Sequence, residues 1–228
     1  MLPDPVIIEH DGFLVVRDDL LPGGTKRRAI HVLFDSEHET YAYASPVYGY
    51  AQLALAYAAR DHGKKAVVFC AKRKEHHQLT IEAAAAGATI YEVENGYLSV
   101  VKARAREYCH YHGWSLLPFG LDDPRFVNAL ADVARIMPVT PTEVWSITSS
   151  GTLTRALQLA WPAATFFGVR VGAAPDAGKA TVYQAAEKFE QPSRHPPPFP
   201  SCKNYDAKLW SFVKQHASPG ALVWNVGA

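Results

Sequence analysis

Hydrophobic positions along this chain follow two periods, one typical of strands and one typical of helices. Short runs of Val, Ile and aromatic residues predict strands at residues 39–44, 65–71, 89–93, 143–148 and 221–228. Ala- and Leu-rich stretches with helical spacing predict helices after Lys26, at residues 50–61, 75–86, 99–111, 124–136 and 155–160, and after Lys208. Because helices and strands alternate, the pattern favours an α/β fold with a mainly parallel sheet.

Two further segments lie outside this alternation. Residues 7–8 and 13–17 flank Asp11-Gly12 and predict a short hairpin near the start of the chain. Residues 172–202 contain a Pro-rich run and predict a loop that crosses the surface.

Composition narrows the class of protein. The 228 residues are 48% hydrophobic and 20% charged with a net charge of +1, so the chain can bury a full core in one domain or in two small lobes. No apolar run approaches a membrane span and the first residues lack signal-peptide features, which favours a cytoplasmic protein. The cysteines and paired histidines lack metal-ligand spacing, so no disulfide framework and no metal site is predicted from Cys70, Cys109, Cys202, His76, His77, His110 and His112.

Two turns that contain glycine carry the candidate chemistry. Gly23 and Gly24 permit positive φ and close approach of the backbone to a ligand, and Lys26 follows at a helix start. At residues 147–154, a strand runs into small hydroxyl residues and then into a helix, so free N–H groups and hydroxyls predict an anion site. Taken singly, the first motif is equally typical of a solvated lysine and the second of a helix cap.

In order, the motifs Gly23-Gly-Thr-Lys26 and Ser149-Ser-Gly-Thr152, separated by a small-residue turn and an Ala-rich helix, resemble the fold type II pyridoxal-phosphate enzymes of the tryptophan synthase β superfamily. The ACC deaminase and D-cysteine desulfhydrase branch is the most similar, and this chain is a reduced-length version. The resemblance implies twisted, mostly parallel sheets with helices on both faces, in two small lobes with pyridoxal 5'-phosphate between them. Residues 1–40 and 125–228 would form the larger lobe, and residues 41–124 the smaller βαβ lobe.

The same resemblance implies roles for the residues of these motifs. Lys26 would be the Schiff-base lysine, and the phosphate loop would consist of Ser149, Ser150, Gly151 and Thr152. Residues 204–208, Asn-Tyr-Asp-Ala-Lys, match the branch's Tyr-(Glu/Thr)-Gly-Lys helix, which implies that Asp206 lies near the pyridine nitrogen and Tyr205 beside the substrate. An N-cap of the last helix is the alternative role for Asp206.

One turn departs from the pattern of the superfamily. Where members carry a Ser-x-Gly-Asn-type loop, this chain has residues 44–52 without an asparagine, and Gly49 stands in its place. Tyr48, Tyr50 or Gln52 would then supply the missing hydrogen bond. The resemblance thus assigns Tyr50 to catalysis beside Lys26 and Tyr205, and assigns to substrate binding Ser45, Tyr48, Gly49 and Gln52.

The implied activity is that of a pyridoxal-phosphate enzyme. It would form an external aldimine with a small amino acid or amino-acid adduct, use the freed Lys26 as a base, and break a bond at Cα by elimination, deamination or decarboxylation. A non-catalytic binding or scaffold protein on a degenerate copy of this fold is the alternative. A homodimer is expected, since a shortened larger lobe would leave a sheet edge or an apolar helix face to cover.

Basic residues leave a further alternative open. They cluster as Lys64, Lys65, Lys72, Arg73 and Lys74, and again as Lys102, Arg104 and Arg106. A solvated surface is one interpretation, and a patch that meets DNA phosphates is the other. Reduced-length members of the superfamily also occur in bacteriophage genomes beside genes for modified pyrimidines, so an amino-acid-modified pyrimidine in phage DNA is an alternative substrate. The protein would then act in the host cytoplasm.

Overall fold

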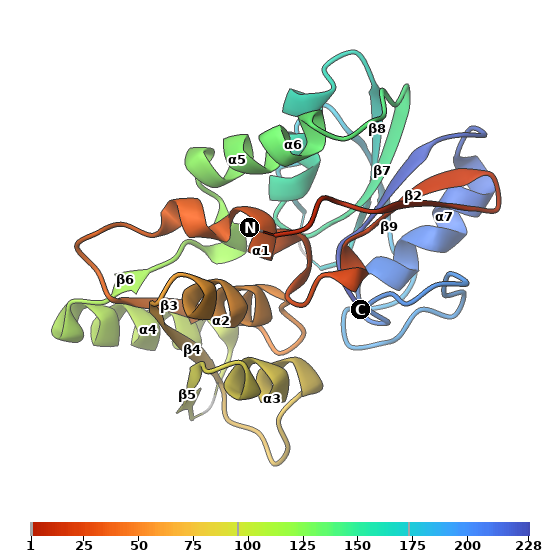
Figure 1. Ribbon diagram of the computed structural model, residues 1–228. Helices are drawn as coiled ribbons and strands as arrows, with labels where there is room; N and C mark the ends of the chain where they lie inside the picture. Colours follow the sequence, from red (N-terminus) through yellow and green to blue (C-terminus); the bar gives the residue numbers. More distant parts are fainter. Residues whose placement is uncertain (1, 95, 173) are drawn as a thin grey trace.

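A computed structural model describes residues 2–94, 96–172 and 174–228 and contains two sheets (Figure 1). The six-stranded sheet has the order β1-β2-β10-β7-β8-β9. Its strands are β1 (Ile7–His10), β2 (Phe13–Arg17), β7 (Glu143–Thr148), β8 (Thr165–Arg170), β9 (Thr181–Gln184) and β10 (Leu222–Asn225). All neighbours run parallel except β1 and β2, which form the predicted hairpin. Asp11 and Gly12 turn it with φ of 53° and 83°, the positive φ that tight hairpin turns require.

The second sheet has four parallel strands in the order β5-β4-β3-β6. They are β3 (Thr40–Ala44), β4 (Lys65–Ala71), β5 (Thr89–Val93) and β6 (Ser115–Leu116). Tyr41 and Tyr43 belong to the core shared with α2 (Ala51–Asp61) and α3 (Gln78–Ala85). Ala42 and Ala44 pack instead with α4 (Leu98–His112). Because side chains alternate along a strand, helices cover both faces of this sheet.

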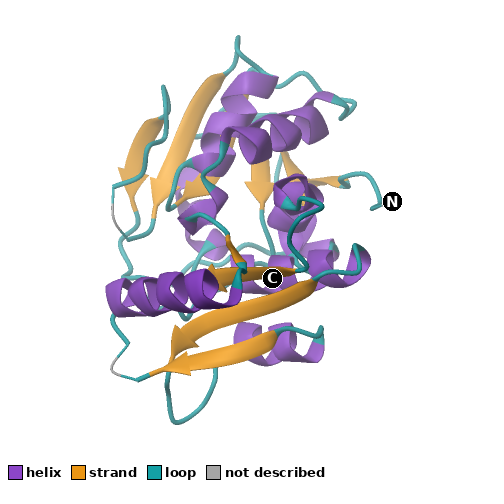
Figure 2. Ribbon diagram, turned by 90° about the vertical axis from the view of Figure 1, so that its left-hand side faces the viewer, coloured by secondary structure: helices purple, strands orange, loops and turns teal. Residues whose placement is uncertain are grey.

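Helices also cover both faces of the six-stranded sheet. These helices are α1 (Gly24–Ala29), α5 (Pro124–Arg135), α6 (Thr152–Ala160) and α7 (Leu209–His216). Ser146 on β7 contacts Thr154 of α6 through their hydroxyls, whereas Trp145 stacks with Tyr183, which contacts Phe212 of α7. Figure 2 shows the strands in two groups that run in different directions. The protein is therefore α/β with mostly parallel sheets flanked by helices, as the sequence predicts.

The structure corrects two predictions about elements. The predicted surface loop at 172–202 contains β9, an edge strand of four residues with a weak alternating signal, fixed by the packing of Tyr183 on Trp145. The predicted helix from residue 75 begins only at Gln78, because the ring of His77 accepts a hydrogen bond from the Leu79 N–H and caps it.

Candidate active site

Lys26 lies on α1 at the junction of the two sheets. The preceding Gly23 and Gly24 have φ of 89° and 63°, and a Cβ on Gly24 would lie 2.2 Å from the carbonyl oxygen of Val226 and 2.9 Å from the Tyr50 ring. Only glycine therefore lets α1 start between the end of β10 and the start of α2. Lys26 itself is half-buried.

A buried network anchors α1 to β10. Asp18 is 0% exposed and accepts hydrogen bonds from Thr25 Oγ1 at 2.7 Å, Arg28 Nε at 2.7 Å and Trp224 Nε1 at 3.1 Å. Burial raises the pKa of Asp18, and the charge and hydrogen bonds of these partners lower it. No local pattern in the sequence indicates this network, because its members lie up to 206 positions apart.

Asp206 is a buried carboxylate with few donors. It is 4% exposed, and neither carboxylate oxygen makes a hydrogen bond of normal distance and angle among the residues that the structure describes. Burial raises its pKa well above the usual range, and the backbone N–H groups of Val226 and Gly227 lie near enough to oppose that rise together with the charge of Lys26. The N-cap of α7 is Lys208, and Asp206 makes no capping hydrogen bond. The geometry therefore does not support the capping alternative.

Lys26 and Asp206 act on each other through their charges. Burial lowers the pKa of Lys26, and the negative charge of Asp206 raises it. Within the described ranges, no ion pair joins the two groups. A desolvated amine and a desolvated carboxylate thus lie close enough for each to shift the pKa of the other.

The turn at residues 149–152 leads from β7 into α6. Gly151 has a φ of 87°, and the hydroxyls of Ser150 and Thr152 lie 2.9 Å apart. Among the described residues, no carbonyl accepts from the N–H groups of Ser149, Ser150, Gly151 or Leu153. These free donors at a helix N-terminus suit a phosphate.

Two residues that the sequence did not single out connect this turn to the rest of the site. Gly120 packs so closely on Ser150 that a Cβ would lie 2.5 Å from the Ser150 Cβ. The N–H of Gly120 donates to the hydroxyl of Tyr43 on β3, and Tyr43 lies near enough to Tyr205 to raise its pKa. Burial is the main cause of that rise, and the charge of Asp206 adds to it.

The turn between β3 and α2 is held together by its own side chains. Ser45 Oγ donates to the Pro46 carbonyl at 2.9 Å, and a Cβ on Gly49 would lie 2.9 Å from that Oγ. Gln52 is 0% exposed and donates to the Gly49 carbonyl at 3.0 Å while it accepts from Thr80. The Gln52 amide therefore holds the turn, which leaves it unavailable for the missing asparagine's hydrogen bond.

Two tyrosines of this region differ in their surroundings. The Tyr50 hydroxyl donates to the Ala228 carbonyl at 2.9 Å, and burial raises its pKa. The Tyr48 ring lies 5.0 Å from that of His77 and 5.4 Å from that of Phe189, measured between centroids. Tyr50 thus ties the end of the chain to α2, whereas Tyr48 faces the segment before Tyr205.

These groups fit pyridoxal phosphate in three respects. The buried carboxylate of Asp206, which pairs with no cation among the described residues, suits the protonated ring nitrogen. The desolvated Lys26 suits the aldehyde, and the open N–H groups around Ser150 suit the phosphate. Across the described ranges, no group of three or more His, Cys, Asp or Glu residues could hold a metal ion. No helix among them is long and apolar enough to cross a membrane.

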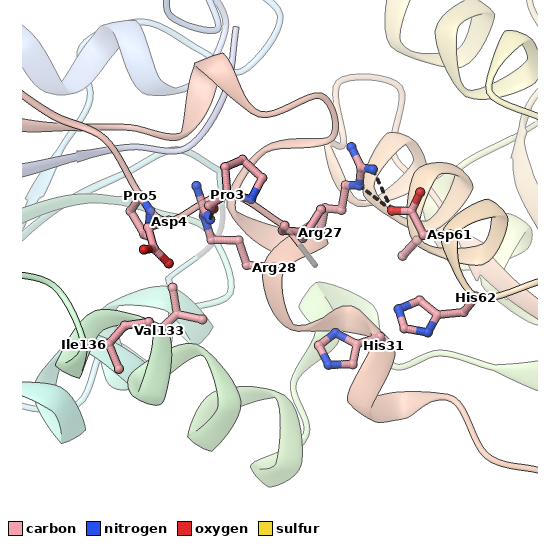
Figure 3. A pocket seen from close by; sticks show the side chains of 12 residues that line it. Pro3, Asp4, Pro5, Arg27, Arg28, His31, Asp61, His62, Val133 and Ile136 are labelled. Carbon is pink, nitrogen blue, oxygen red and sulfur yellow. Dashed lines mark hydrogen bonds and ion pairs between the residues drawn. The ribbon is translucent and has the colours of Figure 1, made fainter.

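A cavity of about 640 Å³ lies on another side of α1 (Figure 3). Arg27, Arg28 and His31 line it, together with His62 of the turn after α2, and Lys26 does not. Figure 3 shows Arg27 paired with Asp61 at its edge. Neither Lys26 nor Asp206 lines this cavity.

The predicted basic cluster is partly neutralised. Lys65, Lys72 and Arg104 pair with Glu39, Glu94 and Glu107. The ammonium of Lys64 donates to two backbone carbonyls, and that of Lys102 lies 3.7 Å from the centroid of the Phe119 ring.

Known proteins are similar to this chain in structure but not detectably in sequence. No family model and no curated protein matches the sequence. Among solved structures, an ACC deaminase homologue has a TM-score of 0.78 and 14% identity, over 94% of this chain and 84% of that one. A threonine deaminase from T.th. has a TM-score of 0.70 and 16% identity, over 94% and 86%. O-ureido-L-serine synthase has a TM-score of 0.72 and 15% identity, over 98% and 88%. The chain therefore has the fold of the fold type II pyridoxal-phosphate enzymes, the superfamily that its sequence resembles.

Proposed function

We propose that this protein is a pyridoxal-phosphate-dependent enzyme that breaks a bond at the Cα of an amino acid or amino-acid adduct. The observation that carries the proposal is the buried carboxylate of Asp206, which pairs with no cation among the described residues, near the desolvated amine of Lys26. A buried carboxylate without a cationic partner is costly, and a cationic ring N–H would offset that cost. When bound, pyridoxal phosphate supplies an electron-withdrawing ring that stabilises negative charge at Cα.

Each residue then has a physical task. Asp206 would hold the ring nitrogen in its protonated form through charge pairing. Lys26 would hold the aldehyde and would move a proton at the substrate's Cα, for which its lowered pKa supplies a larger share of neutral amine. The Ser149, Ser150, Gly151 and Thr152 turn binds the phosphate through N–H groups and hydroxyls.

The substrate would lie between the β3–α2 turn and Tyr205. The N–H groups of Tyr48, Tyr50 and Ala51 have no carbonyl acceptor in the described part of the chain, so they suit the substrate carboxylate, with Ser45 and Gly49 shaping the turn. Tyr205, with its raised pKa, stays protonated and can donate to the substrate. The hydroxyl of Tyr50 donates to the Ala228 carbonyl, so Tyr50 would act on the substrate through its backbone N–H rather than its hydroxyl.

Elimination and deamination are the reactions that the comparisons support best, because a threonine deaminase and an ACC deaminase homologue share the fold. Decarboxylation shares the same first steps. A modified pyrimidine in DNA remains an alternative substrate, supported by Arg73, Lys74 and Arg106, which form no ion pair among the described residues. Binding to duplex DNA that weakens steeply with salt would support it.

The decisive experiment asks whether Lys26 carries the cofactor. Purified protein is incubated with pyridoxal phosphate, reduced with borohydride and digested, and mass spectrometry locates the adduct. We expect the adduct on Lys26, its absence in Lys26→Ala, and its retention in the control Lys65→Ala, whose lysine is exposed. An adduct elsewhere, or none, would favour the alternative of a non-catalytic scaffold.

A further inference from the structure

The segment around Phe189 is tied down by the same short motif that supplies Asp206. Asn204 Nδ2 donates to the carbonyl of Phe189 at 3.2 Å, and Lys208 Nζ donates to the carbonyl of Lys188 at 2.8 Å. Within residues 204–208, Tyr205 and Asp206 therefore belong to the candidate site. Asn204 and Lys208 hold the segment at residues 188–189.

Lys208 makes its contact at an energetic cost. The side chain is 1% exposed, and burial lowers its pKa. Its ammonium donates to a neutral carbonyl, which offsets only part of the cost of removing a charge from water. The contact fixes the position of Lys188 and therefore also that of the next residue, Phe189.

Phe189 bridges the two sides of the candidate site. Its ring centroid lies 5.4 Å from that of Tyr48 on the β3–α2 turn and 6.1 Å from that of Tyr205. The ring planes meet at 62° and 63°, the edge-to-face geometry that aromatic rings prefer. Three aromatic rings from three segments thus pack together where the proposed function places the substrate, and they are named here the aromatic wall: Tyr48, Phe189 and Tyr205.

We propose that Phe189 is a specificity-determining residue, and that the aromatic wall selects substrates whose side chain is an aromatic or similarly flat apolar group. Lys208 and Asn204 are positioning residues that hold Phe189 in the wall. The inference rests on the proposed function. A flat apolar side chain can pack against these rings with the same edge-to-face geometry, whereas a small side chain makes fewer contacts and a charged one loses hydration there.

The test compares three amino acids as probes of the protein loaded with pyridoxal phosphate. Calorimetry measures the affinity for L-phenylalanine, L-alanine and L-aspartate. We expect L-phenylalanine to bind most tightly, and Phe189→Ala to reduce its advantage over L-alanine by roughly tenfold or more, with little change for L-alanine itself. The matched control Tyr111→Ala removes an aromatic ring that is 83% exposed and should change nothing.

A second arm tests the positioning residues without turnover. In Lys208→Met, amide hydrogen exchange of residues 186–191 should become at least several-fold faster, and the preference for L-phenylalanine should fall as in Phe189→Ala. Asn204→Ala should show a smaller effect of the same kind, which keeps the test open if Lys208→Met fails to fold. The control Lys214→Met replaces a half-exposed lysine of α7 and should leave this segment unchanged.

The outcomes separate the two proposals. If the Lys26 adduct forms but Phe189→Ala keeps the preference, or Lys208→Met and Asn204→Ala leave exchange of residues 186–191 unchanged, the inference is wrong and the proposed function stands. If no adduct forms in the unsubstituted protein, the proposed function fails and the inference fails with it.

Discussion

Lys26 and Asp206 are both desolvated and form no ion pair among the described residues, yet each shifts the pKa of the other's side chain. An unpaired lysine and an unpaired carboxylate at close range both lose hydration, so the cofactor-free protein stores a cost there. A ligand with a cationic N–H for Asp206 and a carbonyl for Lys26 would relieve it. The predictions below follow from this relationship and from the glycines around it.

Asp206→Asn should stabilise the cofactor-free protein. The folded-state pKa of Asp206 is raised, so its contribution is fully present below the unfolded pKa near 4 and is lost as pH rises through the folded value. At neutral pH we expect a gain of roughly 1–3 kcal/mol in the free energy of unfolding. Urea denaturation between pH 4 and 8 measures it, and equal pH slopes for both proteins would contradict the assignment.

The cofactor should stabilise Asp206→Asn less than it stabilises the unsubstituted protein. Added pyridoxal phosphate should raise the melting temperature of the unsubstituted protein more than that of Asp206→Asn, because the amide cannot pair with a cationic nitrogen. Equal shifts would show that the Asp206 carboxylate does not face the ring.

Ser150→Ala and Thr152→Val should weaken phosphate binding. Each removes a hydroxyl from the turn before α6, and a hydrogen bond to a charged group contributes about 1.5–3 kcal/mol, so affinity should fall roughly tenfold or more. Inorganic phosphate serves as the probe in a thermal-shift titration. Ser218→Ala, which removes a hydroxyl that contacts Glu143 at the other end of β7, is the control and should bind phosphate unchanged.

Gly151 is unsuitable for that test. A Cβ on Gly151 would lie 1.7 Å from the Asp176 carbonyl oxygen, so any substitution moves the segment at residues 176–177 as well as the turn. A loss of cofactor in a Gly151 variant would therefore not identify the phosphate contact.

Gly24→Ala should destabilise the protein far more than Gly63→Ala. The two glycines have φ of 63° and 64°, so a left-handed alanine is equally unfavourable at both positions. At Gly63 a Cβ would meet nothing within 4 Å, whereas at Gly24 it would lie 2.2 Å from the Val226 carbonyl oxygen. We expect an extra loss of roughly 1–3 kcal/mol in Gly24→Ala. Equal denaturation midpoints would contradict the packing of α1 against β10.

A homodimer stays a prediction, and substitution of the exposed Ile136 can test it. Ile136 is 69% exposed at the end of α5 and lines the cavity of Figure 3. We expect light scattering at micromolar concentration to give twice the chain mass of 25.1 kDa, and Ile136→Asp to shift the protein to single chains. Ile81→Asp changes a residue that is 50% exposed on α3 and is the control. A single-chain mass for the unsubstituted protein would refute the dimer.

Local patterns were enough to predict most of the regular elements, but not β6, β8 or β9. The apolar run at residues 65–71 became β4 with its predicted bounds, because a strand buried on both faces needs an unbroken apolar stretch. Asp123 and Pro124 begin α5, since the aspartate caps the helix and proline fits its first turn. The four residues of β9 lacked such a signal, because their strand pairing depends on β8 and on Trp145.

By itself, the sequence determined most of the segments that form strands and helices, and where glycine, lysine and hydroxyl residues stand beside helix starts, because these are properties of neighbouring residues. Only the tertiary structure decided which polar groups find partners. Asp18 obtains three side-chain donors from residues up to 206 positions away, whereas Asp206 obtains no side-chain donor among the described residues. Both are buried aspartates, and no local pattern distinguishes them, since hydrogen bonding in a core depends on every segment packed around it.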